Sequence, residues 1–242
     1  MRYKCIVSYK GNAYVGFQSQ INGLAIQDVI EEKLKIIFRE DIRIVIASRT
    51  DAHVHAKGQV FHFDAREIDT YKLKGSLNGL LPKDIHIRDI EIVADDFHCR
   101  YLSKGKWYRY LINIGEYDPL LDGLAYQCFY KVDVAKMIEA SKLFIGKHDF
   151  SAFNTTPKSE KEDQVREIYS FDILRKGDLL IIDVKGDGFL RHMVRILVGT
   201  LLDVARGRKS ISDVQAMLED KEKEVLRFNI DACGLYLMQI YY

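Results

Sequence analysis

Two β-type runs on either side of a short polar loop constrain the fold of this chain most strongly. Residues 42–46 are rich in β-branched side chains, and residues 59–63 are aromatic and β-branched, so both are predicted to be strands. The loop between them carries Asp51 directly after Arg49 and Thr50. Loops held by rigid strands often carry chemistry, and a neighbouring cation favours an ionised carboxylate. Asp51 is therefore a candidate nucleophile or base.

Strand and helix patterns continue on both sides of this loop. Alternating or β-branched residues predict further strands over 3–9, 85–92, 106–112 and 234–241, and a hairpin made of 168–174 and 179–184. Apolar residues at helical spacing predict helices over 26–38, 134–144, 191–205 and 211–218. Asp133 is a plausible N-cap, and Ser210 and Asp213 have the spacing of a capping box. The sequence of residues 77–82 indicates only that a short segment ends there.

These patterns predict an α+β fold. We expect two similarly built halves of mainly antiparallel sheet flanked by helices, residues 1–103 and 104–242, with a central active-site cleft between them. No apolar run approaches the roughly 20 residues needed to cross a bilayer. The four cysteines form no CxxC pair, which argues against structural zinc and favours free thiols in a reducing cytoplasm. The net charge of +1 does not decide whether the chain binds nucleic acid, so local clusters must.

The local sequence leaves several interpretations of Asp51 open. It is either a buried carboxylate steered by Arg49 or a turn residue that caps its own loop, as Asp often does. In a third interpretation, Asp51, His53 and His55 alternate along an extended chain and meet at a zinc ion. His62 would then be a fourth ligand. No second cluster of metal ligands stands out, so these imidazoles are more simply solvent-facing or RNA-facing.

Basic residues gather in two places that would suit RNA. Lys104 and Lys106 begin a segment that interleaves cations with aromatic rings, including Tyr108, a combination that fits phosphates and an unstacked base. The alternative is an amphipathic strand with its rings in the core. Arg191 and His192 lie with Arg195 at an expected helix start, where positive side chains oppose the helix dipole unless an anion lies there. The alternative is a set of salt bridges to nearby acids.

Two further charged stretches are interpreted as surface. Residues 206–209 are read as a solvated helix terminus, and the mixed charges of residues 158–163 as a mobile surface loop.

Motifs spread over nearly the whole chain resemble those of tRNA pseudouridine synthases of the TruA type. The opening motif, YKGNAYVGFQSQ at 9–20, is similar, and so is the catalytic loop, RTDA at 49–52 with VHA and GQV after it. Later landmarks follow in the same order at 78–85, 96–100, 106–112, 146–150, 165–166, 189–195 and 234–237. Any one of these motifs would be weak, but their shared order argues against coincidence.

The resemblance implies a function and a set of site residues. Asp51 would be the catalytic aspartate, Tyr108 would pack against the target uracil, and Arg195 would pair with Asp51 across the cleft. Arg49 would hold the flipped nucleotide or the loop. The basic clusters themselves, and not the resemblance, predict RNA contacts for Lys104, Lys106, Arg191 and His192. The resemblance further implies a cytoplasmic homodimer that modifies uridines of the tRNA anticodon stem-loop, positions 38–40, with no metal and no organic cofactor.

Two positions depart from the family pattern. Many members carry glycine where this chain has Ser48 and His53, and glycine has backbone freedom that the other two lack. We expect the loop to keep its shape with His53 turned outward. Two alternatives stay open: a metal-dependent hydrolase that uses the Asp51 and His53 cluster, and a non-catalytic RNA-binding paralogue.

Overall fold

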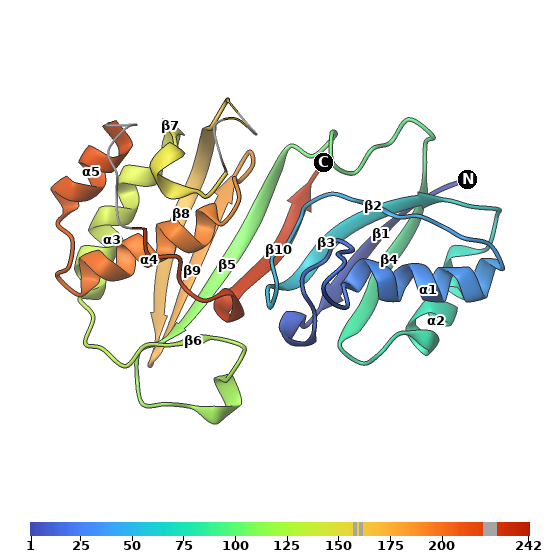
Figure 1. The fold of residues 1–242 in the computed structure, drawn as a ribbon, viewed down its shortest axis with the longest axis horizontal. Helices are drawn as coiled ribbons and strands as arrows, with labels where there is room; N and C mark the ends of the chain where they lie inside the picture. Colours follow the sequence, from blue (N-terminus) through green and yellow to red (C-terminus); the bar gives the residue numbers. More distant parts are fainter. Residues whose placement is uncertain (157–158, 160–161, 220–226) are drawn as a thin grey trace. The chain divides into compact units, whose positions relative to one another are not determined.

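The chain folds into two compact units, which are described separately. A computed structural model describes residues 1–156, 159, 162–219 and 227–242 (Figure 1). Unit 1 comprises Met1–Lys104 and Tyr236–Tyr242, and unit 2 comprises Gly105–Leu235. The last strand of the chain thus returns almost entirely to unit 1. Strands and helices occur in both units, which confirms the α+β class.

Unit 1 is built on a mixed sheet with strand order β4-β1-β3-β10. Its strands are β1 Arg2–Tyr9, β2 Val45–Ile46, β3 His55–Asp64, β4 Ile85–Val93 and β10 Leu235–Tyr241. β1 pairs antiparallel with both β3 and β4, and β2 pairs antiparallel with β3. β10 runs parallel to β3, with Tyr236 opposite His55. The two strands around Asp51 are thus neighbours in one sheet.

The predicted strand over residues 42–46 is shorter than expected. Only Val45–Ile46 forms a strand. Ile42 and Ile44 are buried, but the backbone N–H of Ile44 donates to Glu31 Oε1 at 3.0 Å instead of joining the ladder. The β-branched run is thus explained by burial beside a helix, and only its end pairs in the sheet.

Two helices complete unit 1: α1 Ile26–Phe38, as predicted, and α2 Thr70–Leu80, which was missed. α1 packs through Phe38, whose ring lies against the rings of Tyr3 and Phe63. α2 has only a narrow buried stripe, Leu73 and Leu77. Its sequence also contains two glycines, which have low helix propensity, so the helical pattern is weak.

In unit 2, strands pair antiparallel in the order β5-β9-β8-β7, and the short β6 pairs parallel with β5. Its strands are β5 Gly105–Asn113, β6 Tyr126–Gln127, β7 Gly146–Asp149, β8 Val165–Lys176 and β9 Leu179–Gly186. The predicted hairpin is β8 and β9, and Gly177 turns between them with φ +59°. Because this φ lies in the left-handed region, glycine suits the turn.

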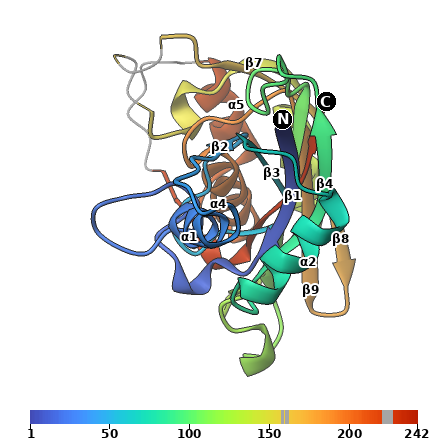
Figure 2. The same ribbon diagram turned by 90° about the vertical axis from the view of Figure 1, so that its right-hand side faces the viewer.

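Three helices of unit 2 are α3 Val134–Ser141, α4 Met193–Ala205 and α5 Ile211–Glu219. In two perpendicular views, α4 and α5 lie on the same face of β8 and β9 (Figures 1 and 2). The predicted caps are confirmed: Asp133 accepts from the Lys136 N–H, and Ser210 and Asp213 bond reciprocally. α4 is buried along nearly its whole length.

The helix predicted over residues 191–205 begins two residues later. His192 has φ +60°, a left-handed conformation that cannot continue a helix backward, so α4 starts at Met193. Arg191 and His192 therefore precede the helix and do not lie within its first turn.

The charged run at 158–163 has residues 158, 160 and 161 outside the described part of the chain. All four cysteines are described, and none of them forms a disulfide bond with another described residue. In the described ranges, no helix has both the length and the apolar character needed to cross a bilayer.

Candidate functional site: the Asp51 loop and the residues of unit 2

Asp51 lies in the connection between β2 and β3, where the sequence placed it. The side chain is half-buried, and the Val54 N–H donates to the Asp51 carbonyl oxygen at 3.2 Å, which closes a tight turn. β3 begins at His55, directly after this turn. The carboxylate is thus carried by an irregular segment that leads into a ten-residue strand in the middle of the unit 1 sheet.

The opening motif of the chain holds this loop by close backbone contact. A Cβ atom on Gly16 would lie 2.6 Å from the Thr50 carbonyl oxygen, and Gly16 also has φ +121°. A Cβ on Gly11 would clash with the Val54 carbonyl. Phe17 N–H donates to the Thr50 oxygen at 3.3 Å. Two glycines therefore let residues 11–17 lie directly on the backbone that carries Asp51.

Buried polar side chains fix the same loop from within the unit. The hydroxyls of Tyr9 and Thr50 share a buried hydrogen bond of 2.7 Å. Gln59 is fully buried, and its Nε2 donates to the Ser48 carbonyl oxygen at 2.6 Å. Because buried polar groups lose free energy when unpaired, these bonds specify one loop conformation.

The two positions where many family members carry glycine differ in conformation. Ser48 is not among the described residues with positive φ, so serine is accommodated without backbone strain. His53 has φ +65°, a conformation that costs a non-glycine residue about 1–2 kcal/mol. Its side chain is exposed, as predicted, and its Nδ1 lies 3.0 Å from the Asn12 carbonyl oxygen.

The chain around Asp51 does not have the extended geometry that the zinc interpretation requires. Residues 52 and 53 form a turn, so Asp51, His53 and His55 do not alternate along a strand. His55 is 1% exposed, and its Nδ1 accepts the Gly11 N–H at 3.0 Å. Among the described residues, no group of three or more His, Cys, Asp or Glu side chains is arranged to hold a metal ion.

His62, the suggested fourth zinc ligand, is also a core residue. It is 3% exposed and lies on β3 opposite Lys4 of β1. Burial, aided by the charge of Arg2, lowers its pKa from 6.5 to about 4. A buried neutral imidazole explains His62 better than a solvent-facing or RNA-facing one.

Tyr108 lies on β5 in unit 2. Its ring is 6% exposed and meets the ring of Phe189 edge-on, with the ring centroids 5.2 Å apart. Its strand partner on β9 is Val184. Alternation along β5 turns Trp107 and Arg109 to the opposite face, where both bond the carboxylate of Asp183. The two faces of β5 therefore differ: Tyr108 lies on a buried face, and Trp107 and Arg109 lie on the opposite face, where they bond Asp183.

Arg195 lies in the first turn of α4 and bonds a loop of unit 2. Its Nε donates to the Ile230 carbonyl oxygen at 2.8 Å. The guanidinium of Arg195 also acts on the carboxylate of Asp231. Burial alone would raise the pKa of Asp231, but the hydrogen bond from the Cys233 N–H and the charge of Arg195 lower that pKa below its usual value. The Tyr110 hydroxyl also donates to the Asp231 carbonyl. The guanidinium is thus fixed at Nε by a segment far away in sequence.

The remaining predicted RNA contacts are placed at the surface or near it. Lys104, Arg49 and Arg191 are exposed, and Lys106 is half-buried. The expected steering of Asp51 by Arg49 stays a prediction. His192 is half-buried, and its Nδ1 bonds Thr155 Oγ1 at 2.8 Å.

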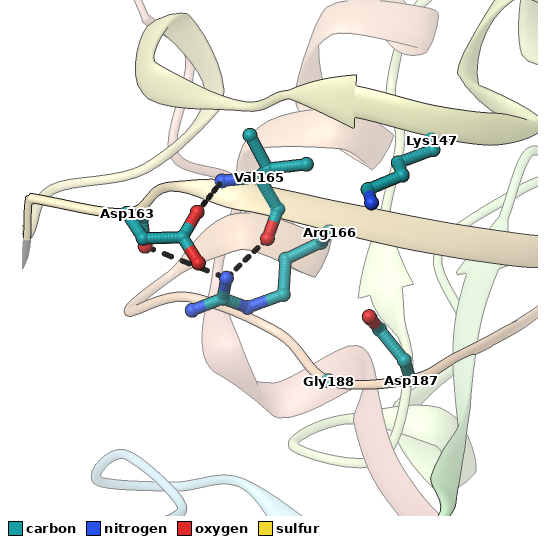
Figure 3. Close-up of a pocket in the computed structure, with 6 residues that line it drawn as sticks. All are labelled: Lys147, Asp163, Val165, Arg166, Asp187 and Gly188. Atoms are coloured by element: carbon teal, nitrogen blue, oxygen red, sulfur yellow. Dashed lines mark hydrogen bonds between the residues drawn. The ribbon is translucent and has the colours of Figure 1, made fainter.

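A pocket of about 560 Å³ opens on unit 2, lined by Lys147, Asp163, Val165, Arg166, Asp187 and Gly188 (Figure 3). Two cations and two carboxylates line it, so its formal charge is balanced. Arg166 donates to the carbonyls of Asp163 and Val165, and Asp187 accepts the Glu167 N–H. None of the predicted site residues lines this pocket.

Known proteins identify the class to which this fold and these motifs belong. A family model described as tRNA pseudouridine synthase matches residues 5–102 and 140–242. The chain therefore belongs to the tRNA pseudouridine synthase family, and its reaction is the isomerisation of uridine to pseudouridine in tRNA. The resemblance found in the sequence motifs is confirmed.

Individual relatives are similar along the full chain. It is 42% identical over 242 residues to tRNA pseudouridine synthase A of Exiguobacterium sp. strain AT1b and covers 98% of that protein. It is 40% identical to tRNA pseudouridine synthase A of Exiguobacterium sibiricum, covering 96% of it. Identity to the protein of the same name from Staphylococcus aureus strain Newman is 40%, with 91% of it covered.

Residues that support the site were missed in the sequence. The opening motif contains Gly11 and Gly16, but the sequence alone assigns no structural role to either glycine, or to Gln59 and Thr50. Two glycines within six residues, just before a helix, were the available signal for close backbone contact. The partners of the two buried polar side chains lie 11 and 41 residues away in sequence, so no local pattern identifies them.

Proposed function

We propose that Asp51 is the catalytic carboxylate and that the target uridines lie in the anticodon stem-loop of tRNA, positions 38–40. The observation that carries the first part is the fixation of the Asp51 turn by residues 11–17 and by the buried Tyr9–Thr50 bond. A half-buried carboxylate on an irregular but strongly held loop suits a group that must meet a reacting atom at a set position.

The reaction explains why such a carboxylate is needed. The bond from uracil N1 to ribose C1′ breaks, a bond from C5 to C1′ forms, and the proton on C5 is lost while N1 gains one. An ionised aspartate acts either as the nucleophile at C1′ or as the base at C2′. Because the uridine is stacked in RNA, it must first be flipped out of the stack.

Tyr108 and Arg195 are proposed to act on the same uridine. Tyr108 stacks on the released uracil and keeps it from escaping, and Arg195 pairs with Asp51 and keeps that carboxylate ionised. Support comes from the resemblance, and from the fixed settings of both side chains within unit 2: Tyr108 against Phe189 and Arg195 at the Ile230 carbonyl. Lys104, Lys106, Arg191, His192 and the exposed Arg49 are proposed to contact the RNA.

The same resemblance supports a homodimer in the cytoplasm that needs no metal and no organic cofactor. A net charge of +1 means that RNA binding relies on local basic faces, so affinity should fall as salt concentration rises.

The test of the proposed role is Asp51→Asn, which keeps the size of the side chain and removes its charge. We expect turnover, measured as tritium release from RNA labelled at uridine C5, to be abolished, while gel-shift affinity for the RNA is retained. Retained turnover would exclude Asp51. Sequencing-based mapping of pseudouridine in RNA from cells with and without the gene identifies the modified positions.

Two alternatives have their own outcomes. Activity lost on dialysis against EDTA and restored by zinc would favour a metal-dependent enzyme. RNA binding without any single turnover of a stem-loop would favour a non-catalytic paralogue.

A further inference from the structure

His53 stands in an unusual position beside the proposed catalytic carboxylate. Its φ of +65° is one that glycine adopts freely and histidine adopts rarely. Its side chain is exposed. It lies two residues after Asp51, inside the turn that the Val54 N–H closes onto the Asp51 carbonyl. A large polar side chain at a strained, exposed position is better explained by a contact it makes than by folding alone.

The hydrogen bond of the ring fixes which nitrogen carries the proton. Nδ1 lies 3.0 Å from the carbonyl oxygen of Asn12, and a carbonyl oxygen only accepts. Nδ1 must therefore be the donor, and in the neutral imidazole Nε2 is left as an acceptor. Within the described part of the chain, no hydrogen bond or ion pair engages Nε2.

The same bond also fixes the orientation of the ring. Asn12 belongs to the turn Gly11–Ala13, which packs on the loop through Gly11. The backbone N–H of His53 additionally donates to the Tyr14 carbonyl at 3.4 Å. With ring and backbone both held by the opening motif, Nε2 is presented to solvent in a preorganised direction, which reduces the entropy lost on binding.

The substrate must bring its sugar–phosphate backbone to this place. Residues 51 and 53 have Cα atoms no more than about 8 Å apart, since each of the two steps along the chain spans 3.8 Å. A nucleotide whose C1′ reaches the Asp51 carboxylate therefore brings its own ribose and the neighbouring ones into the vicinity of residue 53. The ribose 2′-hydroxyl is the hydrogen-bond donor that distinguishes RNA from DNA.

We propose that His53 is a substrate-binding residue whose Nε2 accepts a hydrogen bond from a ribose 2′-hydroxyl of the RNA strand entering the Asp51 loop. This inference rests on the proposed role of Asp51. It assigns to a residue that departs from the family pattern a direct contact with the substrate backbone.

The experiment is a binding cycle between protein and RNA, made in the Asp51→Asn background so that the substrate is not consumed. The protein carries His53 or His53→Gly; glycine keeps the left-handed backbone and removes the ring. The RNA is a tRNA stem-loop, either all-ribose or with one 2′-deoxy substitution at or beside the target uridine. We expect His53→Gly to weaken binding of the all-ribose RNA about three- to tenfold.

Coupling between the two changes separates a direct contact from a structural role. At one ribose, the deoxy substitution should weaken binding to the His53 protein by a similar factor and have no further effect on the His53→Gly protein. Additive effects at every ribose tested, or unchanged binding by His53→Gly, would overturn the proposal. In protein with Asp51 intact, the loss in kcat/KM should lie in KM; a loss confined to kcat would also overturn it.

Two control variants make these results specific. His53→Asn tolerates the left-handed backbone and offers a shorter polar group, so it should behave like His53→Gly in the binding cycle. Arg39→Gly relieves the other described left-handed position of unit 1, with φ +60°, and should leave the coupling at the ribose intact. Failure of the Asp51 assignment appears separately, as turnover by Asp51→Asn protein.

Discussion

The Asp51 loop in unit 1 and the Tyr108 and Arg195 positions in unit 2 are held in place by different means. The loop is irregular, and neighbouring backbone reaches it so closely that Gly11 and Gly16 have no space for a side chain. Tyr108 and Arg195 lie on a regular strand and helix, where the backbone bonds itself and only side-chain contacts set the position. The position of the proposed catalytic carboxylate thus depends on backbone contact, whereas the positions of Tyr108 and Arg195 depend on their side-chain contacts.

The largest effect should come from filling the space beside the loop. Gly11→Ala and Gly16→Ala each place a methyl group against a loop carbonyl, and Gly16 would also be strained at φ +121°. The loop must move or the protein loses about 3 kcal/mol of stability. A shift of about 1 Å in a reacting group costs on the order of 100-fold in rate, so turnover should fall at least that much.

A matched control is Gly75→Ala in α2, where a Cβ meets no atom within 4 Å. Since alanine is the better helix former, this variant should be about 0.5–1 kcal/mol more stable and keep its turnover. Urea unfolding and tritium release measure both quantities. Full activity in Gly11→Ala and Gly16→Ala would show that close backbone contact does not position the loop.

The same difference explains what the sequence predicts well. Most of the β-type runs, the helical periodicity of α1 and the caps of α3 and α5 are local signals that the structure confirms; the run at 42–46 is the exception. α2 was missed because its two buried leucines and two glycines make a weak pattern, although Asp69 caps it through the Lys72 N–H. An interaction can be predicted from the sequence when the two residues that make it lie within one or two helical turns of each other along the chain.

Contacts distant in sequence account for the remainder. The flanking β-type runs placed Asp51 in its loop, but neither the Gly16 contact with Thr50 nor the Arg195 bond to Ile230, 35 residues away, follows from any periodic pattern. The 42–46 run illustrates the converse: Ile42 and Ile44 are buried, and the Ile44 N–H bonds Glu31 of α1, yet burial alone does not distinguish a strand from a buried loop.

The second prediction tests whether unit 2 depends on side chains. Arg195→Ala removes both the proposed partner of Asp51 and the bond to the Ile230 carbonyl, and we expect kcat to fall about 100-fold, as for loss of one charged donor at a reacting site. Arg195→Lys keeps a cation without the planar fork, so it should recover part of the rate. Single-turnover kinetics measure the step, and unchanged rates in Arg195→Ala would contradict its role.

The third prediction compares the acid stability of the units. The folded pKa of His62, about 4, lies below its unfolded value of 6.5, so stability is lost as pH falls from 6.5 to 4. Allowing for solvent screening, we expect this protonation to lower the free energy of unfolding by about 1–2 kcal/mol. Asp231 in unit 2 also has a lowered pKa. Its contribution to the free energy of unfolding is therefore present above pH 3.8 and is lost only as the pH falls further, through the pKa of the folded state.

Amide protection factors between pH 6.5 and 4 should therefore fall in unit 1 before unit 2. His62→Gln lacks the titrating group, so it should flatten this dependence in unit 1. An equal decline in both units, or an unaltered profile in His62→Gln, would show that another group governs acid stability.

The smallest expected effect is a difference in stability between variants at Ser48 and at His53, the two loop positions that depart from the family pattern. Ser48 has no positive φ, so Ser48→Gly mainly adds freedom to the unfolded chain and should lower the free energy of unfolding by about 0.5–1 kcal/mol. At His53, with φ +65°, glycine relieves strain while losing the bond to Asn12, and the net change should stay within about 0.5 kcal/mol. Urea unfolding of both variants makes the comparison. If His53→Gly were the more damaging of the two, the ring and its bond would be worth more to the loop than the relief of its strained backbone.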